Sequence, residues 1–247
     1  MEEAIITTSW DDGHPLDLKL AELLRRYDIP ATFYIPIDNV ERVCMGAGEI
    51  REVGASFDIG AHTYHHRNLR RLSSEEAERE IVEGKKGLEE IIGREMKAFC
   101  YPMGNFNDVI IDMVKRAGFI GARTTKLFTS KVKDPYEIGT TITARDYRST
   151  FYARQSRHSL KSRDYGLFFF TLKKRLLLRC WERIAIETLK YVMKNGGVWH
   201  LYGHSWEIEE NDDWERLTSV LIEIKELAQG ARKVSNSELM ERCAGKV

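Results

Sequence analysis

The sequence has few features of a disulfide-stabilised, membrane-spanning or nucleic-acid-binding protein. Its four cysteines (Cys44, Cys100, Cys180 and Cys243) are widely spaced and contain no CxxC pair, which argues against a zinc ribbon and favours reduced thiols. Lys plus Arg and Asp plus Glu each number 38, so the net charge of +0 gives no reason to expect nucleic acid or an anionic membrane as a partner. No apolar run reaches the length of a membrane span.

The amino terminus also lacks the basic start of a signal peptide, because it opens with Met1-Glu2-Glu3. We therefore expect a cytoplasmic protein. The chain has 247 residues, of which 43% are apolar, and it shows no repeat or linker. This is enough to bury the core of one domain, residues 1–247, and is a common length for an α/β barrel.

Strand and helix patterns alternate through the first half of the chain. Because helices separate the strands, parallel pairing with right-handed crossovers is favoured. About seven β/α units predict a barrel, which is either closed or incomplete. We expect strands at 4–9, 31–36, 57–61, 97–100, 119–123, 138–144 and 198–202, and helices at 16–26, 49–53, 73–92, 107–116, 182–194, 214–227 and 237–243.

Residues 124–170 are harder to place, and we expect this segment to close over a pocket. Its aromatic residues either contact a bound ring or pack half-buried. The basic and apolar stretch 171–179 resembles a membrane-surface helix, but a barrel helix with a solvated charged face is the preferred interpretation.

Unusual polar residues follow several of the expected strands. Asp11-Asp12-Gly13 ends the first strand and His62 follows the third. Tyr101–Gly104 and Gly203–Trp206 follow two later strands. All lie at carboxyl ends of parallel strands, the face where barrels place their active sites. Asp-Asp-Gly alone is also an ordinary turn, so the shared location carries the argument.

The spacing of the histidines points to a metal. His62 and His66 are four residues apart, so one helical or turn-like segment can aim both rings at one point. With one carboxylate they form a His-His-Asp site suited to zinc or another first-row divalent ion. His62 and His65 can also converge, and spacing alone leaves both pairs open. Two adjacent acids pointing in different directions suit a metal ligand and a general base.

These segments resemble motifs of a known family. Thr-Ser-Trp-Asp-Asp-Gly at 8–13, His-Thr-Tyr-His-His-Arg-Asn-Leu at 62–69 and Phe-Cys-Tyr-Pro-Met-Gly at 99–104 are similar to the first three motifs of the polysaccharide deacetylase (NodB-homology) family. Their order and spacing agree, as does Ile-Pro-Ala-Thr-Phe-Tyr at 29–34. The resemblance covers about residues 4–125 and returns at 196–207.

The resemblance implies a distorted (β/α)7 barrel and a metal-dependent hydrolase that cleaves a C–N amide bond. N-deacetylation of an amino sugar or a small N-acyl compound is the expected reaction. It further implies one divalent ion, with zinc preferred over cobalt or nickel, and a carbohydrate or small-molecule substrate. A homo-oligomer is an open alternative. The implied roles are general base for Asp11, metal ligands for Asp12, His62 and His66, oxyanion donor for the Met103 N–H, and proton donor for His204.

The sequence departs from the family pattern in its third and last motifs. Cys100 stands where the family usually has an Arg that pairs with the catalytic Asp, and Arg123 is a candidate replacement. His200 competes with His204 for the role of acid, and Glu207 is expected to be solvated. His14 reaches the pocket rim or caps the next helix.

Two other functions fit the same residues. One is ring opening of a cyclic imide or ureide by an amidohydrolase of the same superfamily. The other is a sugar-binding barrel without catalysis, which the missing Arg supports. A cytoplasmic location favours a small N-acyl compound or the cytosolic face of a sugar precursor over extracellular chitin, xylan or peptidoglycan.

Overall fold

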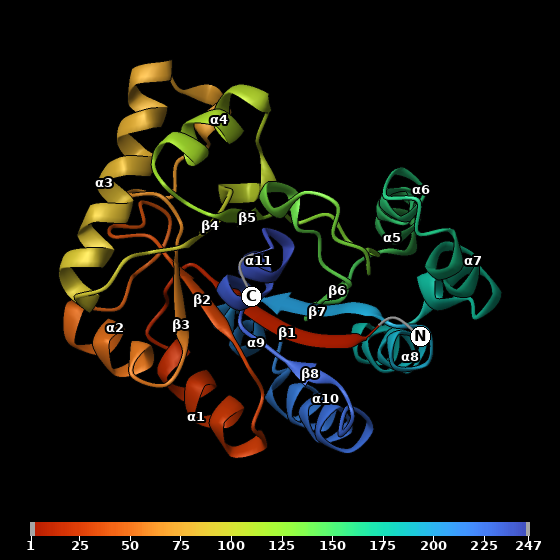
Figure 1. Ribbon diagram of the computed structural model, residues 1–247. Helices are drawn as coiled ribbons and strands as arrows, with labels where there is room; N and C mark the ends of the chain where they lie inside the picture. The colour runs from red at the N-terminus through yellow and green to blue at the C-terminus, as the bar shows by residue number, and fades with distance from the viewer. Residues whose placement is uncertain (1–2, 246–247) are drawn as a thin grey trace.

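The computed structural model describes residues 3–245 and shows a curled parallel sheet with helices around its outer face (Figure 1). The strands run in the order β5-β4-β3-β2-β1-β7-β6, and β8 pairs with β1 off this path. The strands are β1 Ala4–Asp11, β2 Thr32–Ile35, β3 Asp58–Ala61, β4 Ala98–Cys100, β5 Gly121–Arg123, β6 Ile142–Thr143, β7 Gly197–Gly203 and β8 Arg232–Lys233.

The helices connect these strands and cover them. The α-helices are α1 Asp17–Tyr27, α2 Ala47–Gly54, α3 Ser74–Ile92, α4 Asp108–Arg116, α5 Ser149–Gln155, α6 Arg157–Lys161, α7 Tyr165–Lys173, α8 Trp181–Asn195, α9 Ser205–Glu210, α10 Trp214–Leu227 and α11 Asn236–Cys243. Short 3-10 turns are η1 Leu69–Arg71, η2 Pro102–Gly104, η3 Pro135–Glu137 and η4 Leu176–Leu178. None of the helices in the described part of the chain is long and apolar enough to cross a membrane.

Residues 138–143, which include β6, lie between β5 and β7. Ile138 forms a parallel bridge with Arg123 of β5, and β6 pairs with β7. Between these contacts, the Thr141 N–H donates to the His200 carbonyl at 2.8 Å. The predicted distorted (β/α)7 barrel is therefore confirmed. The expected strand 138–144 is confirmed only where it touches its two neighbours.

Helix starts follow the local signals in the sequence. Ser73 and Glu76 form a capping box at α3, in which Ser73 Oγ accepts from the Glu76 N–H at 3.2 Å. Asn107 caps α4 by accepting from the Ile110 N–H at 3.0 Å. These signals explain why both predicted helices begin within one residue of their expected positions.

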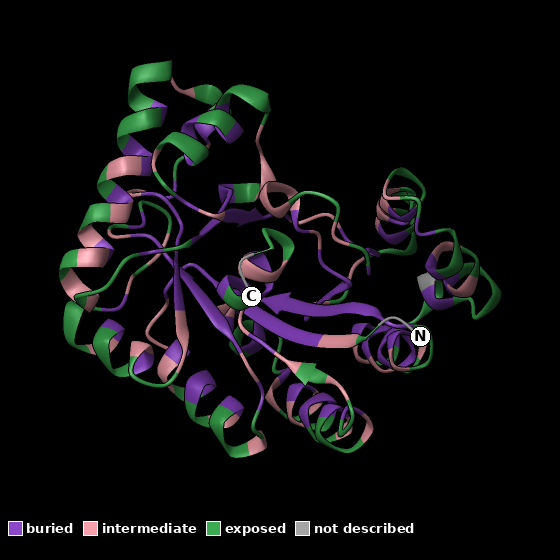
Figure 2. Ribbon diagram, viewed as in Figure 1, coloured by how far each residue is buried: buried purple, intermediate pink, exposed green. Residues whose placement is uncertain are grey.

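Strand β1 separates an apolar layer from a polar barrel interior. Ile6 and Trp10 belong to the large apolar cluster shared with the outer helices. The alternate residues Thr7, Ser9 and Asp11 bond to groups inside the barrel, as the two-residue period of a strand requires. Figure 2 shows that β1, β2 and β7 are almost wholly buried. Polar side chains in the interior therefore need partners from the protein itself.

Helix α11 supplies such partners at the end of the barrel seen in Figure 1. Its fully buried Asn236 accepts from Thr7 Oγ1 at 2.8 Å and donates to the Tyr34 hydroxyl at 3.0 Å. The Asn236 N–H also donates to Thr32 Oγ1 at 2.8 Å. One side chain and its backbone thus tie β1 and β2 to the last helix.

Residues 144–180 differ from expectation. The stretch 171–179 is not one barrel helix, because α7 ends at Lys173 and η4 follows at Leu176. The segment forms α5, α6 and α7, which the sequence analysis did not place. Tyr152 and Phe128 are buried, whereas Tyr147 and Phe151 stack on each other at 4.0 Å between ring centres. These four aromatic residues of the expected segment 124–170 thus pack against one another.

We expect Asn236→Ala to lower the free energy of unfolding by roughly 2–4 kcal/mol, because Thr7 and Tyr34 lose a buried partner. Urea unfolding followed by circular dichroism measures this change. Asn195→Ala is the control, since Asn195 is exposed and bonds only locally to the Tyr191 carbonyl. Equal losses in the two variants would show that Asn236 does not hold the barrel end together.

Candidate active site

A sharp reversal of the chain after β1 separates two neighbouring carboxylates. Asp12 and Gly13 have φ angles of 78° and 62°, so the strand stops immediately after Asp11. A Cβ atom at position 13 would lie 2.7 Å from Ile35 Cγ2, which leaves room only for glycine. Asp11 is directed to Arg123, and Asp12 to a pair of histidines. The predicted divergence of the two acids is confirmed.

Asp12, His62 and His66 form a compact and buried cluster. Asp12 Oδ1 lies 3.7 Å from His62 Nε2 and 3.4 Å from His66 Nε2. One potential ligand atom from each residue lies within 4.8 Å of the other two. The two histidines lie in a turn rather than a helix, with φ angles of 67° at Thr63 and 57° at His66.

Neighbouring groups orient the side chains of this cluster so that they can bind a cation. His62 Nδ1 donates to the Cys100 carbonyl at 2.8 Å, so its Nε2 lone pair faces Asp12. Burial, followed by the neighbouring His66, lowers the pKa of His62 to about 4, which keeps the ring neutral near pH 7. The Trp206 indole donates to Asp12 Oδ2 at 2.9 Å and holds the carboxylate. The set of one carboxylate and two imidazoles therefore fits a divalent first-row ion.

His65 lies outside the cluster. Its Nδ1 contacts Glu80 Oε1 at 2.8 Å, and its backbone N–H donates to Glu80 Oε2 at 2.8 Å. Glu80 is a buried residue of α3. Of the two histidine pairs that the spacing allowed, the structure therefore favours His62 with His66.

Arg123 supplies the cation that Cys100 does not. The fully buried Arg123 guanidinium donates to Asp11 Oδ1, and Cys100 Sγ lies 4.0 Å from Asp11 Oδ2. Burial would raise the pKa of Asp11, but the charge of Arg123, aided by His204, lowers it below the ordinary value. Arg123 is thus confirmed as the replacement, and it reaches Asp11 from β5 instead of β4.

His204 lies beside both acids. His204 Nε2 is 3.9 Å from Asp11 Oδ2 and 3.9 Å from Asp12 Oδ2. His204 Nδ1 is 2.7 Å from Glu207 Oε2, and Glu207 also pairs with Arg145. Burial alone would lower the pKa of His204, but the Glu207 hydrogen bond and the charges on Asp12 and Asp11 raise it to about 9. The expectation of a solvated Glu207 was wrong, because α9 buries it against His204.

His200 has a different environment. It is fully buried in β7 with Nε2 2.8 Å from Ser9 Oγ, and burial, followed by the charge of Arg123, lowers its pKa to about 3. A neutral ring in the barrel interior is a poor proton donor at neutral pH. The geometry therefore favours His204 over His200. His14 acts near a helix start, accepting from the Leu16 N–H at 3.2 Å.

Met103 lies in η2, directly after β4. Its φ angle is 56° and its side chain is 47% exposed. Gly104 packs closely, since a Cβ atom there would lie 2.1 Å from Thr125 Oγ1. This strained turn fixes the backbone of Met103 at the same end of the sheet as Asp11. Its role as oxyanion donor stays a prediction.

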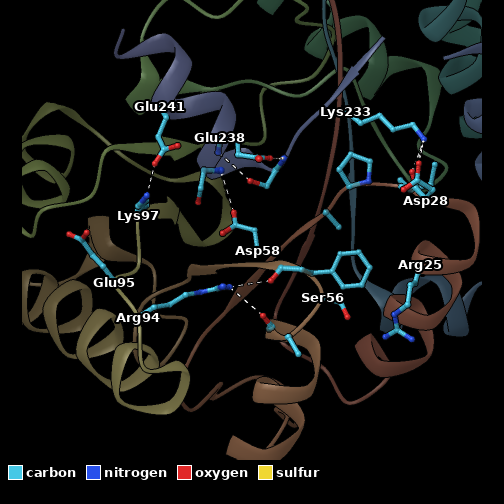
Figure 3. Close-up of a pocket in the computed structure, with 18 residues that line it drawn as sticks. Arg25, Asp28, Ser56, Asp58, Arg94, Glu95, Lys97, Lys233, Glu238 and Glu241 are labelled. Atoms are coloured by element: carbon cyan, nitrogen blue, oxygen red, sulfur yellow. Dashed lines mark hydrogen bonds and ion pairs between the residues drawn. The ribbon is translucent and has the colours of Figure 1, made fainter. Parts of the chain in front are cut away.

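A cavity of about 660 Å³ lies at the opposite end of the barrel (Figure 3). It is lined by residues that precede the strands, including Ala31, Phe57 and Lys97. Its charges are largely paired with one another, as Lys97 with Glu241 at 2.5 Å and Lys233 with Asp28 at 2.7 Å. None of the cluster residues lines this cavity. It is therefore not the candidate active site.

Comparison with known proteins agrees with this geometry. Residues 1–122 match the model of the family described as polysaccharide deacetylase. Over these residues the chain belongs to the polysaccharide deacetylase family. The matched part includes Asp11, Asp12, His62 and His66 and ends just before Arg123.

Two relatives and one solved structure illustrate the similarity. The chain is 32% identical over 119 residues to a peptidoglycan-N-acetylglucosamine deacetylase of Bacillus cereus, covering 47% of this chain and 54% of the relative. It is 30% identical over 125 residues to a chitooligosaccharide deacetylase of Azorhizobium caulinodans, covering 47% of this chain and 56% of the relative. The chain thus spans about half the length of these relatives. A structure from Mycobacterium smegmatis, provisionally assigned to the polysaccharide deacetylases, shares the fold with a TM-score of 0.66 and 14% identity. The match covers 99% of this chain and 91% of that one.

Three contacts in the site were not expected from the sequence. Trp206 binds Asp12, Glu207 binds His204, and Arg145 binds Glu207. Trp206 and Glu207 lie two and three residues after His204, so a helix starting at residue 205 was the available signal. Arg145 had none, because it lies in the segment that could not be placed.

We expect the chain to bind about one zinc or cobalt ion, measured by isothermal titration calorimetry. Asp12→Ala, His62→Ala and His66→Ala should each weaken binding by roughly 100-fold or more, because each removes one of three ligands. Trp206→Phe should weaken it by roughly 10-fold or more, since Asp12 loses its orienting donor. His65→Ala is the control and should bind as the wild type does. Tight binding by the His62 variant would exclude this cluster.

Asp11 and Arg123 should show strong energetic coupling in a double-mutant cycle of Asp11→Asn and Arg123→Gln. Each single change leaves the other buried group without its partner, so we expect a coupling free energy of roughly 2–4 kcal/mol from urea unfolding. The exposed pair Arg116–Glu78, at 3.1 Å, is the matched control and should give less than about 1 kcal/mol. Additive effects at Asp11 and Arg123 would contradict the assigned pair.

Proposed function

We propose that this protein is a metal-dependent hydrolase that removes an acyl group, most simply acetyl, from the nitrogen of an amino sugar. The observation that carries the proposal is the joint placement of three units at one end of the barrel. These are the Asp12-His62-His66 cluster, the Asp11–Arg123 pair and the His204–Glu207 pair. Membership of residues 1–122 in the polysaccharide deacetylase family supports the same chemistry.

Asp12, His62 and His66 would hold the divalent ion. When bound, such an ion supplies Lewis acidity toward an acyl oxygen and toward water. Trp206 and the Cys100 carbonyl orient two of these ligands, which reduces the motion of the cluster before substrate arrives.

Asp11 is placed to accept a proton from the attacking water. The Arg123 charge keeps the carboxyl ionised at neutral pH despite its burial, which a general base requires. The same ion pair fixes Oδ1, so Oδ2 is the oxygen that remains to take the proton. Cys100 contributes only a weak S–H contact to Oδ2.

His204 is placed to return a proton to the leaving nitrogen. The carboxylate of Glu207 accepts from His204 Nδ1–H, so the opposite nitrogen, Nε2, faces the two aspartates. The Met103 N–H would donate to the developing oxyanion, where one well-placed donor contributes roughly 3 kcal/mol. The water oxygen bonds to the acyl carbon, the C–N bond breaks, and the products are a carboxylic acid and a free amine.

This geometry disfavours a binding barrel without catalysis. Arg123 provides a guanidinium for Asp11, and the expected lack of that group was the ground for such a barrel. An intracellular, reducing location belongs to the same proposal. Its support is that all four cysteines are free.

The test is release of acetate from N-acetylglucosamine oligomers by the zinc-loaded or cobalt-loaded protein. We expect Asp11→Asn and His204→Gln to lower kcat/KM by roughly 100-fold to 10,000-fold, and chelation to abolish turnover. His158→Gln, outside the site, is the control. The substrate panel includes cyclic imides and ureides. Hydrolysis of cyclic imides or ureides alone would favour the ring-opening hypothesis. Unchanged turnover by the Asp11→Asn variant would reject the proposed mechanism.

A further inference from the structure

One segment of this electrically neutral chain has a large excess of basic over acidic residues. Residues 148–179 contain nine Lys and Arg residues but one acidic residue, Asp164. The other 215 residues contain 29 Lys and Arg and 37 acidic residues. We call residues 148–179 the basic projection, because α5, α6 and α7 stand outside the barrel wall beside α8 (Figure 1).

The charges of the basic projection face solvent. All nine basic side chains are exposed: Arg148, Arg154, Arg157, Lys161, Arg163, Lys173, Lys174, Arg175 and Arg179. Among the described residues, only Lys174 of this set has an acidic partner, Glu187 at 3.3 Å. Asp164 does not neutralise the surface, since it is buried and accepts from the Ser130 N–H at 2.9 Å.

Large apolar side chains are exposed among these charges. Tyr165, Phe169 and Leu172 lie at i, i+4 and i+7 on α7 and are 53%, 64% and 45% exposed. The opposite side of α7 buries Leu167 and Thr171, so the exposed stripe is not the face that anchors the helix.

Past the end of α7 the surface continues in the same way. Leu178 is 71% exposed, and it lines with Leu172 and Arg175 a shallow, mainly apolar hollow of about 410 Å³ between α5 and α7. Figure 2 shows the outer sides of α6 and α7 as exposed.

We propose that the basic projection docks on the surface of an anionic lipid bilayer. Such a surface attracts Lys and Arg, and its interfacial region accepts Phe, Leu and Tyr side chains. Charge complementarity therefore defines the partner, and the exposed apolar stripe distinguishes it from nucleic acid, whose phosphates would leave Phe169, Leu172 and Leu178 in water. This inference does not depend on the proposed catalytic activity.

The expectation of no membrane partner came from the net charge and from interpreting 171–179 as a barrel helix. Neither ground excludes such a partner. The charge is unevenly distributed along the chain, and the stretch breaks at Lys174 and leaves Leu172 and Leu178 exposed.

The test is co-sedimentation of the full chain with vesicles of phosphatidylcholine alone or with about 30% phosphatidylglycerol. We expect binding to the anionic vesicles at least tenfold stronger than to neutral ones, and loss of most binding at high salt. A triple variant with Lys173→Gln, Arg175→Gln and Arg179→Gln should bind anionic vesicles roughly a hundredfold more weakly, because each lost cation weakens binding about fivefold. Lys86→Gln, Arg70→Gln and Lys225→Gln, which remove three exposed cations elsewhere, are the matched control.

A second pair of variants tests the apolar stripe. Phe169→Ser with Leu172→Ser should weaken binding at least tenfold, whereas Val109→Ser with Ile222→Ser, exposed on other helices, should not. In Phe169→Trp, the new indole should shift its emission to shorter wavelength on anionic vesicles and be quenched by brominated lipid. Circular dichroism checks that every variant is folded.

Several results would overturn the proposal. These are equal binding to neutral and anionic vesicles, equal losses in the charge variant and its control, and no response of the introduced indole. Binding of duplex DNA without vesicle binding would assign the surface to nucleic acid. Salt-sensitive self-association without vesicle binding would assign it to contact with the acidic remainder of a second copy.

Discussion

The candidate site depends on the turn at Asp12 and Gly13, where two neighbouring carboxylates are sent to different partners. A strand would direct Asp11 and Asp12 to opposite faces of the sheet, one into the barrel and one toward the helices. The φ angle of 78° at Asp12 instead ends the strand and leaves both acids at its carboxyl end. Asp11 then faces Arg123, while Asp12 faces His62 and His66. The two acids therefore have different partners and can have different roles, although they are neighbours in the sequence.

The polar interior of the barrel maintains this separation. Arg123 is fully buried between the rings of Tyr34 and Tyr202, at 5.2 and 4.8 Å from its guanidinium carbon. Such a cation is costly without a carboxylate partner, so Asp11 is needed as much by Arg123 as the reverse. Toward the other end of the barrel, Asn236 of α11 satisfies Thr7 and Tyr34. The fold thus presents reactive groups at one end and closes the other with neutral hydrogen bonds.

Local signals allowed much of the first half of the fold to be predicted. Capping residues such as Ser73 and Asn107, and the β-branched run at 5–8, are read directly from neighbouring residues. The site residues Asp11, Asp12, His62, His66 and His204 were likewise expected together, because they follow strands that pair in parallel.

What could not be predicted depends on contacts between distant segments. The sequence offered Arg123 only as a candidate partner of Asp11, since the two are 112 positions apart and nothing local links them. Glu207 was expected in water because the sequence does not show that α9 folds against His204. The helices α5 to α7 lack a clear apolar period, and their exposed Phe169 and Leu178 follow no core pattern. The net charge of +0 for the whole chain also gave no indication of the excess of basic residues in the basic projection.

Anomalous X-ray scattering from a crystal soaked in zinc, recorded above and below the zinc edge, tests the central claim most directly. We expect one strong peak within bonding distance of Asp12 Oδ1, His62 Nε2 and His66 Nε2, with Asp11 still paired to Arg123. A peak held by His65, by Cys100 or by the acids of the opposite cavity, or no ordered peak, would contradict it.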